Sequence, residues 1–118
     1  MKSYELVVHP VENEADTRKA DVIGCLDSHT VVGFERELQS VVDSGANVVI
    51  LNLESLSYIS SAGISALMGL THRLRKSEGE LYLLRPTEKV RRVFRTLGFT
   101  TIFRIVDEEA EVGSTPRS

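Results

Sequence analysis

The first two apolar runs of the chain are short and rich in β-prone residues. They cover residues 6–9 and residues 20–26, and the polar residues 12–19 connect them. Two such runs around a polar connection predict an antiparallel hairpin.

The apolar positions then recur at helical spacing, three and four residues apart, until Ser44-Gly45 ends the pattern. A glycine just past the last apolar position is typical of a helix end. The spacing therefore predicts a first helix. Its apolar residues are Phe34, Leu38, Val41 and Val42.

Residues 48–53 are almost uniformly apolar and β-branched. That composition is typical of a strand buried on both faces, so we expect this strand in the middle of the sheet. Residues 54–59 are interpreted as a connection. A second helical stripe follows, with basic residues near its far end, and it ends around residues 77–79. The stripe consists of Ile64, Leu67, Met68, Thr71 and Leu74.

The last third of the chain repeats the alternation of strand and helix. Residues 81–84 predict a strand, Pro86 a turn, and residues 102–106 a final strand. Between them lies a third helix, closed by Gly98. Its apolar face is Val90, Val93, Phe94 and Leu97. Residues 107–112 predict one acidic helical turn.

Strands that alternate with helices after a hairpin predict an α/β fold with a mixed sheet, mainly parallel and with an antiparallel edge. The 118 residues, with 42% apolar and 26% charged side chains, suit one compact domain. We place it at residues 4–112. Residues 113–118 have the composition of a flexible tail.

Charge and cysteine content exclude several classes of function. The net charge of −3 gives no general attraction to nucleic-acid phosphates. The single cysteine, Cys25, forms no internal disulfide and suggests no metal site. Neither a signal peptide nor a run of about 18 apolar residues is visible. We expect a cytoplasmic protein without membrane insertion, cofactor or metal.

Two serines stand where the buried strand and its connection give way to the second helix. Ser60 is a natural N-cap, its side chain accepting from the first-turn amides, and Ser61 is then the first helical residue. Ala62 and Gly63 keep the surroundings small, so a partner could approach closely. A phosphate on Ser61 would meet the positive end of the helix dipole. The alternative is that both serines only cap the helix.

Enzyme chemistry is not indicated. The nucleophile elbow of serine hydrolases reads Gly-x-Ser-x-Gly, whereas here Ile59 occupies the first glycine position. His72 follows eleven residues later on the same helix, about 16 Å away, which is too far to activate Ser61. No phosphate-binding glycine loop follows a strand.

The third helix also carries a basic sector opposite its apolar face. Such sectors are usually solvated, and the alternative is a docking surface for an acidic partner. The absence of an aromatic stacking platform argues against nucleic acid. The sector consists of Lys89, Arg91, Arg92 and Arg95.

The order of elements, together with three short motifs, resembles a stand-alone STAS domain, the family of bacterial anti-sigma factor antagonists. The most specific motif is residues 49–53, Val-Ile-Leu-Asn-Leu, followed by residues 58–63, Tyr-Ile-Ser-Ser-Ala-Gly. Residues 24–27, Gly-Cys-Leu-Asp, and residues 97–99, Leu-Gly-Phe, also match. The resemblance covers residues 4–112 and implies a STAS-like mixed sheet.

In that family the helix start commonly reads Asp-Ser-Ser/Thr-Gly, and the first serine is phosphorylated. The resemblance makes Ser61 the phospho-acceptor, with Ser60 as a second candidate. This chain departs from the pattern because Ser60 replaces the aspartate and Ala62 a second hydroxyl. The partner-binding residues so implied are Asp27, Ser60, Ser61, Ala62, Gly63 and Ile64.

The resemblance further implies partner switching. The unmodified protein would bind a GHKL-type serine kinase that is also an anti-sigma factor, phosphorylation would end binding, and a metal-dependent serine phosphatase would reset the switch. The alternative is a non-switching STAS subunit of an ABC-type lipid transporter or a sensory scaffold. The sequence does not indicate which sigma factor or other client protein is controlled, nor the oligomeric state.

Overall fold

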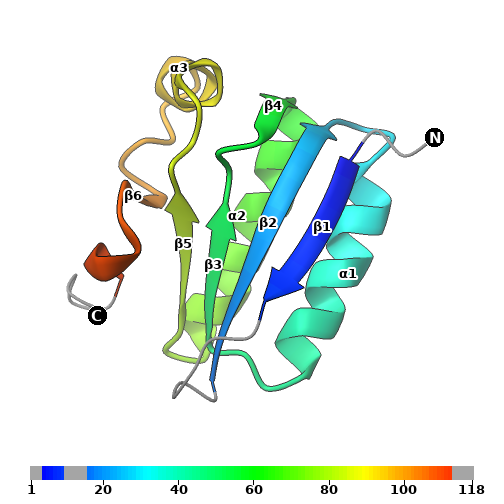
Figure 1. Cartoon of the computed structure of the whole chain (residues 1–118), viewed down its shortest axis with the longest axis vertical. Helices are drawn as coiled ribbons and strands as arrows, with labels where there is room; N and C mark the ends of the chain where they lie inside the picture. Colours follow the sequence, from blue (N-terminus) through cyan, green and yellow to red (C-terminus); the bar gives the residue numbers. More distant parts are fainter. Residues whose placement is uncertain (1–3, 10–15, 113–118) are drawn as a thin grey trace.

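The computed structural model describes residues 4–9 and 16–112, apart from the side chain of Glu111. One sheet has helices α1 and α2 against one of its faces (Figure 1). The strands are β1 (Tyr4–His9), β2 (Thr17–Leu26), β3 (Val48–Asn52), β4 (Leu56–Ile59), β5 (Glu80–Leu84) and β6 (Arg104–Val106). The helices are α1 (Val31–Asp43), α2 (Ser61–Lys76), α3 (Glu88–Thr96) and the 3-10 turn η1 (Glu109–Glu111). The predicted tail, residues 113–118, lies outside the described residues.

The six strands follow the order β1-β2-β3-β5-β6, and β4 pairs with β2 off this path. β1 and β2 are antiparallel, and every other pairing is parallel. The predicted α/β fold, with its hairpin, its central strand β3 and its mainly parallel sheet, is therefore confirmed.

The interpretation of residues 54–59 as a plain connection was wrong, because they contain β4. β2 is long enough to pair with β3 through its first five residues and with β4 through its end, from Gly24 to Leu26. The register shifts between Gly24 and Cys25, where Gly24 has φ 99°. The four residues of β4 are buried, exposed, exposed and buried in turn, which is not the alternation that identifies a strand. Their long-range partner makes them a strand.

Several strand ends also differ from prediction. β1 begins at Tyr4 and β2 at Thr17, earlier than expected, while β3 ends one residue early, at Asn52. β6 begins at Arg104 because Phe103 turns into the core, where its ring lies 5.3 Å from that of Phe94.

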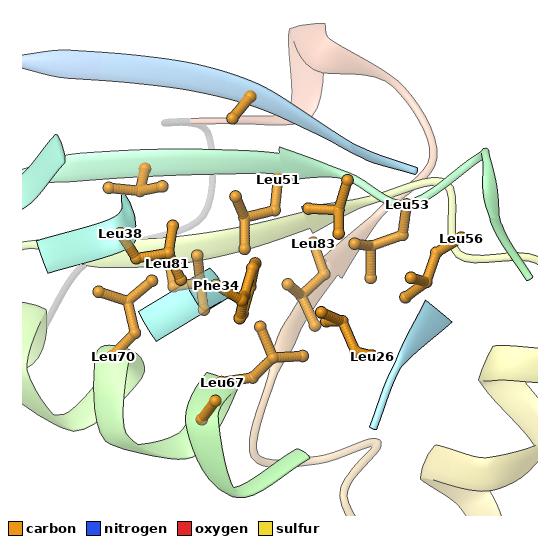
Figure 2. Packing of buried hydrophobic residues seen from close by; sticks show 14 of the residues in the cluster. Leu26, Phe34, Leu38, Leu51, Leu53, Leu56, Leu67, Leu70, Leu81 and Leu83 are labelled. Atoms are coloured by element: carbon orange, nitrogen blue, oxygen red, sulfur yellow. The ribbon is translucent and has the colours of Figure 1, made fainter. Parts of the chain in front are cut away.

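Buried apolar side chains lie on both faces of the sheet. The larger cluster fills the space between the sheet and α1 and α2, with Phe34 and Leu67 facing Leu51 and Leu83 (Figure 2). A smaller cluster lies on the opposite face: Val48, Ile50, Tyr82, Leu84 and Val106. β3 and β5 are thus buried on both sides, which explains their continuous apolar sequence.

Candidate docking site at the start of helix α2

The parallel pairing of β2 with β4 brings two predicted site segments together. Leu26 pairs with Ile59, so Asp27 and Ser60 directly follow neighbouring strand ends. α1 and α2 begin just beyond, at the same edge of the sheet (Figure 1). The backbone N–H of Ser60 donates to the carbonyl of Leu26 at 2.8 Å, which fixes the two segments to each other.

Ser61 and Ser60 differ in accessibility. Ser61 is the first residue of α2, as predicted, and it is exposed. Ser60 is the N-cap by backbone, since its carbonyl accepts from the N–H of Ile64 at 3.0 Å. Its side chain makes no capping hydrogen bond, and its Oγ is buried without a partner among the described residues. The predicted capping by the Ser60 hydroxyl is therefore wrong, and the first-turn amides of α2 stay uncapped by it.

The next residues hold α2 against the strand ends. Ala62 is half-buried, whereas Gly63 and Ile64 are buried. A Cβ on Gly63 would lie 2.7 Å from Ile59 Cγ1 and 2.9 Å from Leu26 Cβ. Ser61 is therefore the outward-facing residue of the motif, while Gly63 and Ile64 determine where it sits.

Asp27 organises the turn before α1. Its Oδ1 accepts from the backbone N–H groups of Thr30 at 3.1 Å and His29 at 2.9 Å. These two backbone hydrogen bonds, that of Thr30 first, lower the pKa of Asp27 below its usual value. The hydroxyl of Thr30 donates to the carbonyl of Cys25 at 2.9 Å and closes the turn. The Asp27 carboxylate is thus a structural part of the site's edge.

The lowered pKa predicts an acid-dependent contribution of Asp27 to stability. A carboxylate whose pKa is lower in the folded state stabilises fully above its unfolded value of about 3.9 and loses that effect as pH falls through the folded value. We expect wild type to be more stable than Asp27→Asn at pH 7, with the difference shrinking below pH 4. Urea unfolding of both proteins across pH 3–7 measures this. A difference independent of pH would contradict the assignment.

The basic sector of α3 is largely paired within the molecule. Arg91 forms an ion pair with Asp107 and donates from Nε to the carbonyl of Pro86 at 3.2 Å. Arg95 pairs with Glu88 at 2.6 Å. Of the three arginines, Arg92 is exposed and has no ion pair among those found in the described part of the chain. A docking role for the whole sector is therefore not favoured.

One residue near the site was missed from the sequence. Tyr58, on β4 three positions before Ser61, is 42% exposed. Lys89 of α3 places its Nζ 5.8 Å from the centre of the Tyr58 ring, a cation–π contact. The available signal was an aromatic residue two positions before the serine pair.

A metal cluster and a membrane-spanning helix each place requirements on the described residues. No three His, Cys, Asp or Glu side chains in this part of the chain gather in a way that could hold a metal ion. None of its helices combines the length and apolar character needed to cross a bilayer.

The order of strands, the two helix starts at one edge and the serine motif agree with one family. A family model described as the STAS domain matches residues 13–112. The chain belongs to the STAS domain family. BtrV of Bordetella bronchiseptica is 38% identical to this STAS protein over 84 residues, which are 71% of this chain and 72% of BtrV. The anti-sigma-B factor antagonist of Staphylococcus aureus is 32% identical over 89 residues, 75% of this chain and 82% of that protein.

Solved STAS structures share the fold. The anti-sigma factor antagonist SpoIIAA in its unphosphorylated form superimposes with a TM-score of 0.73 at 24% identity, covering 94% of each chain. The phosphorylated form of SpoIIAA from Bacillus gives 0.66 at 23% identity, covering 94% of this chain and 97% of that one. The likeness therefore extends over nearly the whole chain.

Proposed function

We propose that this STAS protein is an anti-sigma factor antagonist that works by partner switching. The unmodified form binds a GHKL-type serine kinase that is also an anti-sigma factor. This binding releases the sigma factor, or another client protein, that the kinase had held. The kinase then transfers the γ-phosphoryl group of ATP to Ser61 Oγ, ADP and the hydroxyl proton are released, and the complex dissociates. A metal-dependent serine phosphatase hydrolyses the phosphoserine and restores binding.

The observation that carries this proposal is the exposed hydroxyl of Ser61 at the first position of α2. Ser60 is the weaker acceptor because its Oγ is buried. The names of the relatives support the antagonist function, and the existence of SpoIIAA in a phosphorylated form supports the switch.

Phosphorylation ends binding through desolvation and repulsion. A phosphoserine adds about −1.5 to −2 charges at neutral pH. The dipole of α2 stabilises that charge in the free protein. In a close-packed complex, the same charge loses its hydration and meets the partner's surface, so the free state is favoured.

Substitution at Ser61 tests the proposal. We expect Ser61→Glu to lose at least about tenfold in affinity for the kinase captured by wild type from a lysate of the source organism, whereas Ser61→Ala binds but is not phosphorylated. Ser65→Glu is the matched control, because Ser65 is exposed one turn further along α2. Binding is measured by calorimetry with the kinase identified by mass spectrometry. Equal affinity of folded Ser61→Glu and wild type would overturn the switch.

A second candidate is a non-switching STAS subunit of an ABC-type lipid transporter or sensory scaffold. It is favoured by Ser60, which leaves the helix start without the carboxylate usual in the family and has its own hydroxyl turned inward. In that case wild type and Ser61→Glu retain the same permease, ATPase or scaffold proteins.

A further inference from the structure

β1 leaves one edge of the sheet open. It lies at the end of the strand order, and within the described part of the chain β2 is its strand partner (Figure 1). Alternate residues of such an edge strand direct backbone N–H and C=O groups away from the sheet. Those groups can pair with a further strand.

Apolar side chains accompany this open edge. Tyr4 is buried against α1, where its hydroxyl donates a hydrogen bond to Glu37 Oε1. This contact holds β1 against the helix. Leu6 and Val8 follow on the same face of β1, and Val8 is 47% exposed. They line a groove of about 350 Å³, whose other wall is formed by Glu37, Ser40 and Val41 of α1 and by Ser44 just after it. A strand added at this edge would cover the groove.

We propose that the β1 edge binds β1 of a second copy of this chain, antiparallel and with the two-fold axis at Val7. In such a pair, two facing side chains lie on the same face of the sheet when their residue numbers are both odd or both even. An axis at Glu5 sets two glutamates opposite each other, and an axis at Leu6 sets Glu5 opposite Val7. An axis at Val7 sets Glu5 opposite His9 and Leu6 opposite Val8, so a carboxylate faces an imidazole that can donate a hydrogen bond to it and an apolar side chain faces an apolar one.

The complementarity points to a second copy as the occupant. Under a two-fold axis each favourable pair occurs twice, as an isologous interface requires. Glu5 is exposed, and His9 already lies 2.9 Å from Asp21 Oδ2. In the dimer, His9 lies between Asp21 of its own chain and Glu5 of the other copy. Two six-stranded sheets thus become one continuous sheet. This inference does not depend on the role of Ser61.

Disulfide trapping tests the register. In a Cys25→Ser background, which removes the native thiol, Val7→Cys places two thiols across the axis, with Cα atoms about 4.5–5.5 Å apart. Leu6→Cys is the matched control, because the two Leu6 positions lie about 8 Å apart in this register. We expect Val7→Cys to form a covalent dimer under mild oxidation and Leu6→Cys to form no covalent dimer. Equal trapping of both, or of neither, would overturn the register.

Sedimentation of the cysteine-free background tests the interface itself. We expect a monomer–dimer equilibrium that depends on concentration and that Val8→Lys shifts at least about tenfold toward monomer, because an edge lysine opposes strand addition. Val32→Lys is the control, since Val32 is 59% exposed on α1 rather than on β1. A chain that stays monomeric up to about 1 mM, or a dimer unaffected by Val8→Lys, would overturn the proposal.

Discussion

Gly63→Ala is expected to destabilise the protein by about 2 kcal/mol, the usual cost of adding one methyl group to a filled core. The added Cβ would meet side-chain carbons of Ile59 and Leu26 at 2.7 and 2.9 Å and the Leu26 carbonyl oxygen at 3.1 Å. The last contact is with backbone, which is itself fixed by the hydrogen bond from Ser60. These close contacts can therefore be relieved only if α2 moves away from the strand ends, and Ser61 moves with the helix. Urea unfolding measures the stability change.

Gly69→Ala is the matched control, because it makes the same substitution in the same helix. Gly69 has open space around its position, with nothing within 4 Å of an added Cβ. Alanine is the better helix former by about 0.5–1 kcal/mol, so this variant should be more stable than wild type. Destabilisation of both variants to the same degree would refute the close contact at Gly63.

Arg75→Met is expected to destabilise the fold by about 3 kcal/mol, because it removes the main partner of a buried carboxylate. The side chain of Glu80, at the start of β5, is 5% exposed. Its Oε1 accepts from Arg75 Nε at 3.0 Å and from the backbone N–H of Leu81 at 3.1 Å. Arg104 remains at 3.5 Å from Oε2 in the variant, at the outer limit for a hydrogen bond. Thermal and urea unfolding measure the loss.

Two further variants separate the buried charge from the loss of an arginine. Lys76→Met removes a neighbouring cation from an exposed position and should change stability by less than about 0.5 kcal/mol. Adding Glu80→Leu to Arg75→Met removes the buried carboxylate that has lost its main partner, and it should recover more than half of the loss. If the double variant is as unstable as Arg75→Met alone, the explanation from an uncompensated charge fails.

The candidate site was partly visible in the sequence. The helical stripe and the strand before it predicted that Ser61 begins a helix, since both signals are local. The orientation of the Ser60 hydroxyl was not predictable, because it depends on how Leu26 and Ile59 close around that residue. Serine is a residue type whose hydroxyl commonly caps helices, but Ser60 caps α2 through its backbone carbonyl alone.

The sequence by itself determined the elements whose signal lies within one segment: the hairpin and the central strand β3, which are β-prone apolar runs, and the three helices, whose apolar positions are periodic. Composition and spacing within a short stretch are enough to indicate such elements. The tertiary structure decided what depends on partners distant in the chain. β4 is a strand because β2 extends beyond β3, and Arg91 is occupied because Asp107 lies beside it. Hydrogen bonds and ion pairs between distant segments leave no pattern in the sequence of either segment. They form only when folding brings the two segments together.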